Sequence, residues 1–171
     1  MLIRRRTPDD LAALSVVLLR VRELDGYPVY LPGDDPVAFI TLPGDPPAWV
    51  VEWEGRVVGH VALSPVVRDS VRAVLELAGA EPPFAHVTRL FVDPDARGRG
   101  CASALLDEAR AHAHREGATA SLDVVSRDGA AIALYDSRGW RRVGESVLDL
   151  PGFPRFDEFV YVEPPARPDI D

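Results

Sequence analysis

The segment from Ala85 to Glu116 constrains the fold more strongly than any other part of the sequence. It opens with "AHVTRLFV", a run of apolar and β-branched residues that predicts a strand. The glycine- and arginine-rich turn "DPDARGRG" follows. A helix is then predicted over 100–116, where alanine and leucine recur at helical spacing and Gly117 ends the pattern. A strand that leads straight into a helix indicates a layered protein of α and β elements.

The rest of the chain continues this alternation around one mixed sheet. The clearest β signal is "AWVVEWEGRVVGHVALSPV", in which Glu54 and Gly55 separate two β-branched and aromatic runs and predict a hairpin. The other predicted strands lie at 2–6, 120–125, 140–150 and 158–164, and the other predicted helices at 7–24, 36–40, 69–79 and 130–138. For 69–79 a strand is the alternative.

Length and composition predict one globular domain. The 171 residues suffice for a single sizeable core, which is assigned to 1–163 and followed by a disordered tail over 164–171. A net charge of -8 argues against a nucleic-acid or anionic-membrane surface. The only cysteine, Cys101, excludes an internal disulfide and agrees with a cytoplasmic location. The run "LAALSVVLL" is too short to span a bilayer, and aspartates precede it, so neither a membrane span nor a signal peptide is expected.

The turn "ARGRG" has the features of an anion site. Gly98 and Gly100 allow several backbone N–H groups to point the same way, and the first N–H groups of the following helix have no partner inside it. The helix dipole and the side chains of Arg97 and Arg99 add positive charge, so the turn can hold a phosphate or pyrophosphate. An ordinary surface turn is the alternative. Neither the Walker pattern nor G-x-G-x-x-G is present.

Three consecutive motifs resemble the GCN5-related N-acetyltransferase (GNAT) superfamily. "LFVDPDARGRGCASALLDEA" is similar to that family's L-x-V-x-P strand followed by [R/Q]-x-x-G-x-[G/A] at a helix start. "SLDVV" and "AAIALYDSRGWRRVG" are similar to its next strand, its A-x-x-L-Y-x-x-x-G-[F/W] helix and the strand after it. The resemblance covers Ala85 to Gly144. It implies the GNAT α/β fold, with a mixed, mostly antiparallel sheet of about six to seven strands and about four helices. The sheet should splay between 85–92 and 121–125.

The resemblance also implies a binding mode for acetyl-CoA. Backbone groups of the 85–92 strand would bind the pantetheine arm, and N–H groups of the turn would bind the pyrophosphate. The implied residues are Leu90, Phe91, Val92, Arg97, Gly98, Arg99, Gly100, Cys101, Ala102, Ser103 and Asp128. Asp128 stands where many members carry a cofactor-contacting asparagine, with a plain helix cap as the alternative. Cys101 is expected to be a small residue at the helix start and not an acyl carrier, and no metal is expected.

The implied reaction moves the acetyl group from a thioester to an amine by direct attack. Tyr135 stands where the family carries the acid that protonates the departing thiolate, and the alternative is a tyrosine that only packs against the sheet. His86, early in the 85–92 strand, is the best candidate for the base, because histidine exchanges protons near neutral pH. A histidine with a purely structural role is the alternative for His86. Glu76, Glu81 and a water relay are weaker choices for the base.

The acceptor side is the least defined part of the sequence. The implied acceptor is a primary amine on a small molecule or peptide, bound by the loop 25–35 and the segment 150–159. Within that loop Tyr27, Tyr30, Asp34 and Asp35 are the candidates for amine recognition. The alternatives are transfer of another acyl group, an oxygen acceptor, and a non-catalytic module that senses acyl-CoA. A homodimer is an open alternative to a monomer.

Overall fold

A computed structural model describes residues 1–164 of the chain, and its central feature is a seven-stranded sheet in the order β1-β2-β3-β4-β5-β7-β6. The strands are β1 (Leu2–Arg5), β2 (Ala48–Trp53), β3 (Arg56–Ser64), β4 (Phe84–Val92), β5 (Thr119–Val125), β6 (Arg141–Leu148) and β7 (Phe156–Val162). All neighbouring pairs are antiparallel except β4 and β5, which are parallel. The tail predicted to be disordered lies, apart from its first residue, outside the described residues.

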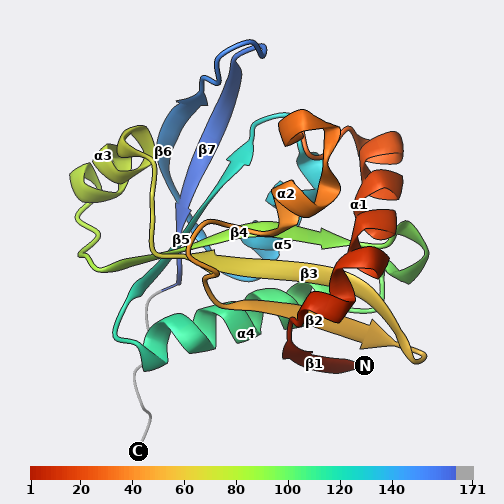
Figure 1. Ribbon diagram of the computed structural model, residues 1–171. Coiled ribbons are helices and arrows are strands. Elements are labelled where there is room, and N and C mark those ends of the chain that lie inside the picture. Colours follow the sequence, from red (N-terminus) through yellow and green to blue (C-terminus); the bar gives the residue numbers. More distant parts are fainter. Residues whose placement is uncertain (165–171) are drawn as a thin grey trace, which may run out of the picture.

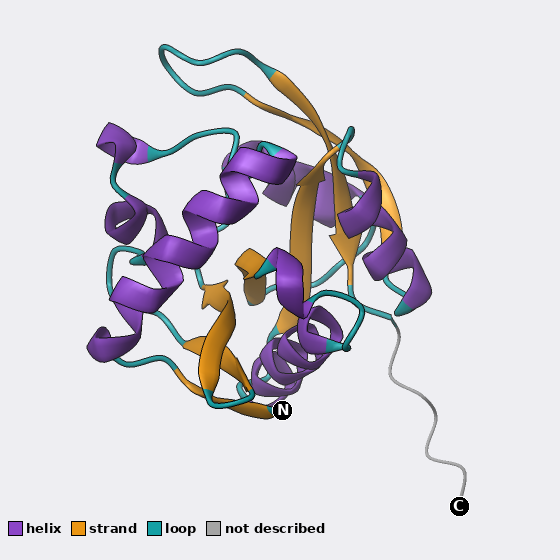
Figure 2. Cartoon of the chain, turned by 90° about the vertical axis from the view of Figure 1, so that its right-hand side faces the viewer, coloured by secondary structure: helices purple, strands orange, loops and turns teal. Residues whose placement is uncertain are grey.

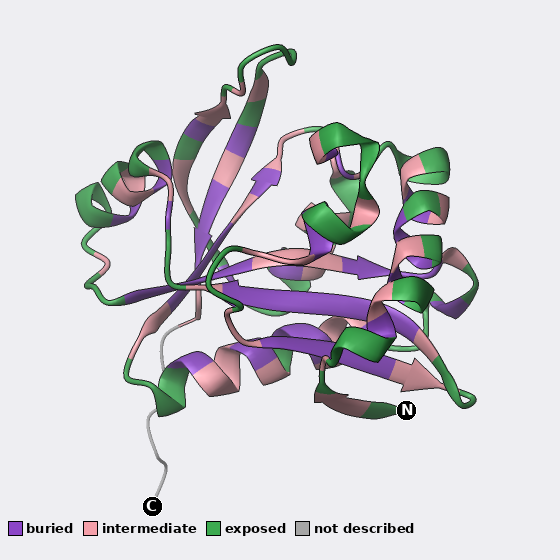
Figure 3. Ribbon diagram, viewed as in Figure 1, coloured by how far each residue is buried: buried purple, intermediate pink, exposed green. Residues whose placement is uncertain are grey.

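Helices cover both faces of the sheet (Figure 1). They are α1 (Leu11–Asp25), α2 (Pro36–Ile40), α3 (Asp69–Leu77), α4 (Cys101–Arg115) and α5 (Gly129–Ser137). Side chains of α1 and α2 form one core with Val50 and Phe91, and α3 packs on Phe84 and β7. The largest core lies on the opposite face, where α4 and Tyr135 of α5 pack against the sheet. The outward surfaces of α1 and α3 are exposed (Figure 3).

The predicted order of elements is confirmed, with small shifts at the ends. The hairpin turn lies at Glu54 and Gly55 as expected, and both have positive φ. The segment 69–79 forms a helix, because Val71 and Leu75 lie one turn apart on its buried side. Residues 1–164 thus contain five α-helices where about four were expected.

The sheet splays between β4 and β5 as predicted. These strands pair only at their beginnings, through Phe84 with Thr119, Ala85 with Ala120 and His86 with Ser121. Beyond His86 the two strands diverge, while β4 stays paired to β3 and β5 to β7. Figure 2 shows the chain turned by 90°, with helices packed around the strands. The remaining edge of β4 therefore offers backbone groups that no neighbouring strand uses. We call this space the β4–β5 opening.

The first strand is tied to the start of α1 by a buried ion pair. Asp10 is 5% exposed, and its carboxylate accepts hydrogen bonds from Arg4 at 2.7 and 2.8 Å and from the Thr7 N–H at 2.7 Å. The hydrogen bond from Arg4 lowers the pKa of Asp10 from 3.8 to about 2. This carboxylate therefore stabilises the folded state above the pKa of the unfolded chain, and the contribution is lost as the pH falls towards 2.

We expect Asp10→Asn to lower the free energy of unfolding at pH 7 by about 1–2 kcal/mol. Urea titration at pH 7 and at pH 3 checks this, because the difference between variant and wild type should shrink at the lower pH. Asp9→Asn is the matched control, since Asp9 is the exposed neighbour of Asp10. An equal loss at both pH values would contradict the ion-pair explanation.

Candidate functional site

The turn between β4 and α4 forms a small hollow at the helix N-terminus. Gly98 and Gly100 adopt left-handed φ angles of 72° and 80°, which residues with a side chain rarely adopt. A Cβ added at either glycine would meet no protein atom within 4 Å. The hollow measures about 220 Å³ and is lined by Val92, Ala96, Arg97, Gly98, Gly100, Cys101, Ala102, Ser103 and Leu134. Together with the free N–H groups at the start of α4, this geometry suits a phosphate group.

The arginines of the turn contact side chains of other elements, which the sequence did not predict. Arg97 lines the hollow but pairs with Asp25 at the end of α1, and Arg99 lies over the Trp53 ring at 5.1 Å. A second pair anchors the start of the turn. Arg20 Nη1 donates to both carboxylate oxygens of the buried Asp93 at 2.8 Å. These contacts hold the turn against α1.

A β-bulge in β4 lies beside the opening. His60 pairs with Phe91 and Ala62 with Thr88, so two residues of β4, Arg89 and Leu90, face one of β3. Arg89 has a φ of 55°, and its carbonyl oxygen lies 2.9 Å from Nδ1 of the fully buried His60. Burial lowers the pKa of His60 to about 4, so the ring is neutral at pH 7 and its Nδ1–H can donate to that carbonyl.

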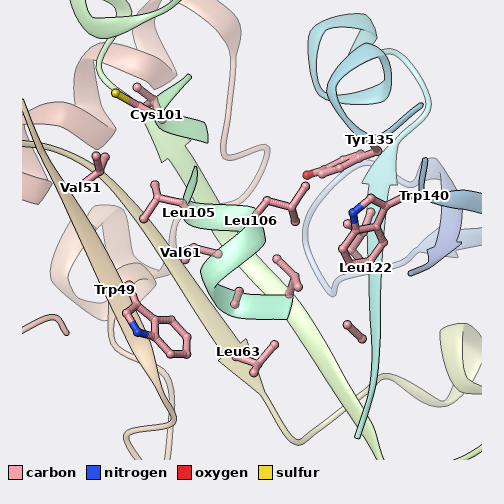
Figure 4. Close-up of a cluster of buried hydrophobic side chains, with 14 of the residues drawn as sticks. Trp49, Val51, Val61, Leu63, Cys101, Leu105, Leu106, Leu122, Tyr135 and Trp140 are labelled. Atoms are coloured by element: carbon pink, nitrogen blue, oxygen red, sulfur yellow. The ribbon is translucent and has the colours of Figure 1, made fainter. Parts of the chain in front are cut away.

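Tyr135 of α5 reaches the β4–β5 opening from the α4 side. The residue is 7% exposed, and its ring packs 5.7 Å from Tyr161 and 6.4 Å from Trp140. Its hydroxyl points away from Trp140 towards the space between β4 and β5 (Figure 4). Burial raises the pKa of Tyr135, and the charge of Asp123 adds to this effect. The phenol therefore stays protonated throughout the neutral range.

His86 lies in a buried network of charged side chains on the opposite face of the sheet. Its Nδ1 is 3.0 Å from Ser121 Oγ, and its Nε2 contacts the carboxylate of Asp123. Arg68, which precedes α3, donates to the other Asp123 oxygen at 2.9 Å and also contacts Glu158 of β7. We call Arg68, His86, Asp123 and Glu158 the charge network.

The charge network is poised to take up a proton. Burial and the neighbouring Asp123 raise the pKa of Glu158 to about 8, against the opposing attraction of Arg68. Burial also acts to raise the pKa of Asp123, but its contact with His86 outweighs this and lowers it. Of the two carboxyl groups, Glu158 is therefore the one that binds a proton more readily, and Asp123 is the one that stays ionised.

Most of the predicted cofactor residues gather at the hollow, and several other candidates have structural roles. Asp128 caps α5 by accepting a hydrogen bond from the Ala131 N–H at 3.0 Å. Cys101 is 2% exposed within the main core, and burial raises the pKa of its thiol. Asp35 caps α2 through one carboxylate oxygen, and Asp34 is exposed at 3.5 Å from Arg22.

The sequence analysis missed Arg68, Asp123, Ser121 and Glu158. The two strands nevertheless carry a signal, because "SLDVV" and "DEFVYV" place Asp123 and Glu158 next to runs of apolar residues. A buried carboxylate needs a partner, so such a position predicts a polar site. Only the fold reveals that the partners are His86 and Arg68. In the part of the chain that the structure describes, no group of three His, Cys, Asp or Glu side chains could hold a metal ion, and no helix could cross a membrane.

Comparisons with known proteins agree with this geometry. Mouse N-acetyltransferase 8 is 34% identical over 110 residues, which are 60% of this chain and 41% of the mouse protein, so the chain spans about two-fifths of that relative. The uncharacterized N-acetyltransferase YjgM of Escherichia coli is 28% identical over 148 residues, 82% of either chain.

Solved structures share the fold. An N-acetyltransferase from Staphylococcus aureus has a TM-score of 0.70 at 20% identity and covers 94% of this chain and 96% of its own. Arabidopsis thaliana NAA60 in complex with acetyl-CoA has a TM-score of 0.69 at 20% identity, with 94% and 97% covered. Residues 18–140 match the model of the Acetyltransferase (GNAT) family. The chain therefore belongs to the GNAT family of acetyltransferases.

Proposed function

We propose that the protein transfers an acetyl group from acetyl-CoA to a primary amine, with Tyr135 as the proton donor and His86 as the proton acceptor. The observation that carries the proposal is the β4–β5 opening. The hollow that can hold a phosphate lies at the end of β4. The Tyr135 hydroxyl reaches the β4–β5 opening from one face of the sheet. The charge network lies on the other face, where β4 and β5 are still paired.

The residues at the hollow fit a CoA cofactor. Left-handed glycines leave the helix N-terminus uncovered, and Ala102 and Ser103 add little bulk. The unused edge of β4 from Val87 to Val92 can pair with the amide groups of a pantetheine arm. Acetyl-CoA supplies an activated thioester, and the chain would orient it with backbone groups.

Two protons must move during the transfer. Tyr135 holds its proton at neutral pH and can give it to a departing thiolate. The amine must lose a proton on the other side of the opening. His86 can receive it, directly or through water, because Asp123 orients the ring and stabilises its charged form. Tyr135 and His86 would then return to their starting states by exchange with solvent.

A panel of primary amines tests the proposed function. Release of CoA thiol from acetyl-CoA is followed with and without each amine, and the product is identified by mass spectrometry. Amine-dependent thiol release with an N-acetylated product is expected. Tight binding of acetyl-CoA with no turnover of any amine would favour the non-catalytic sensor, and an O-acetylated product would favour an oxygen acceptor.

We expect His86→Gln to lower kcat/KM by about 10- to 100-fold and to flatten the acidic limb of its pH profile. The rate rises with pH on this limb because the base must lose its proton before it can act. Glutamine keeps hydrogen bonding to Asp123 but cannot hold the proton. Glu158→Gln is the matched variant within the charge network. A limb that disappears in Glu158→Gln and persists in His86→Gln would assign the proton acceptor to Glu158.

A further inference from the structure

Arg89 carries a half-buried positive charge that lacks an acidic partner. Its Nε donates to the carbonyl oxygen of Phe39 at 2.9 Å, and its guanidinium lies 3.8 Å from the centre of the Phe39 ring. No carboxylate within residues 1–164 lies within 4.0 Å of it, unlike the partly buried Arg4 and Arg68, which each pair with two. Removing a cation from water without a compensating negative charge costs free energy. Arg89 therefore favours the binding of an anionic ligand.

The backbone is distorted at the position that aims this side chain. In a regular strand Arg89 would point to the same face as Val87, which is in the core beneath α4. The bulge and the left-handed φ of Arg89 turn it instead towards α2 on the other face. The contact from His60 to the Arg89 carbonyl holds this conformation. Strained backbone of this kind is retained mainly at functional sites.

The free end of Arg89 is accessible and lies near the loop 25–35, since the Phe39 ring beneath it also packs against Tyr27. In the described part of the chain, Ser146 Oγ is the buried side-chain polar atom without a partner, so the unused N–H groups of Arg89 reach solvent. Burial lowers the pKa of Arg89, and the nearby Asp123 carboxylate acts against this effect. Tyr30 packs at 4.7 Å against Phe153 of the β6–β7 loop, which brings together the two segments expected to line the acceptor site.

We propose that Arg89 binds a carboxylate of the acceptor and that the acceptor is therefore a free amino acid or a close analogue. This proposal rests on the proposed function and specifies its substrate. Arg68 on this face already pairs with Asp123 and Glu158, whereas Arg89 pairs with no carboxylate of residues 1–164. An amino acid held at Arg89 by its carboxylate can direct its amine towards Asp123 and His86.

Matched pairs of acceptors test the assignment. Alanine, phenylalanine and glutamate are each compared with their α-carboxamides, which keep the α-amine and remove the negative charge of the α-carboxylate. We expect the wild type to show a kcat/KM at least about tenfold higher for the acid of at least one pair, because a charge-assisted hydrogen bond is lost in the amide. Arg89→Met should abolish this preference while changing activity on the amide less than about threefold. Dipeptides, which carry the carboxylate one residue further away, should be poorer acceptors than free amino acids.

Arg72→Met is the matched control. Arg72 also lies over a phenylalanine ring, at 5.8 Å, and pairs with no carboxylate in residues 1–164, but it is on α3. Its preference for acids should equal that of the wild type. Equal rates on acids and amides in the wild type, or parallel losses in Arg89→Met, would overturn the proposal.

A binding measurement decides the case in which no pair is turned over. With CoA at saturation, N-acetylphenylalanine and its amide are titrated into each variant by calorimetry. Binding of the acid about tenfold tighter than the amide, lost in Arg89→Met, supports the subsite even though the proposed turnover has failed. Equal or undetectable binding of acid and amide overturns it. Thermal unfolding and CoA binding by Arg89→Met show that the variant is folded.

Discussion

Replacing Tyr135 with phenylalanine should lower kcat by about 100-fold or more while leaving CoA affinity almost unchanged. The substitution removes one oxygen and keeps a ring that is 7% exposed against Trp140 and Tyr161. Without the hydroxyl the thiolate must leave unprotonated or take its proton from water. Steady-state kinetics with the best amine of the panel, together with calorimetric titration of CoA, measures both quantities.

Tyr161→Phe is the matched control for Tyr135→Phe. Tyr161 is equally buried and contacts the Tyr135 ring, but its hydroxyl donates to Asp136 at 3.0 Å. Tyr161→Phe should therefore lower the stability of the fold more than it lowers kcat. Wild-type kcat in Tyr135→Phe would remove the tyrosine from the mechanism and leave water as the proton donor. Burial raises the pKa of Tyr135, so the alkaline limb of the wild-type profile should lie above the neutral range.

Gly100→Val should weaken CoA binding by about 100-fold or more. The valine side chain would enter open space at the helix N-terminus, since no protein atom lies within 4 Å of a Cβ there. That space is where the backbone N–H groups would receive the pyrophosphate. Valine rarely adopts a φ of 80°, so the backbone of the turn would also shift. The N–H groups would then no longer point in one direction.

Gly79→Val separates lost binding from lost stability. Gly79 has the same φ of 80° and equally open surroundings, but it follows α3 at a distance along the chain from the hollow. Both variants should lose a similar amount of thermal stability, and only Gly100→Val should lose CoA in calorimetry. Normal CoA affinity in Gly100→Val would show that the phosphates bind elsewhere.

Local sequence determined the elements and the turn. The strand, the paired glycines and the helix from Phe84 to Arg115 follow from residues adjacent in the chain, as does the helix that carries Tyr135. Glycine spacing, apolar periodicity and helix stops act over a few residues, so they can be interpreted without knowing what packs against them. The motif order also predicted that β4 and β5 would diverge.

Tertiary structure alone decided which groups meet at the opening. The sequence assigned no partner to His86. Its partner Asp123 lies 37 positions away in the chain, and Arg68, which also contacts Asp123, lies 55 positions from Asp123. The sequence shows Arg89 only as one arginine in a strand. The bulge and the contact with His60 direct its side chain towards Phe39. Such contacts depend on strand register and on which side chains exclude water. Those are properties of the packed sheet, so no window of neighbouring residues contains them.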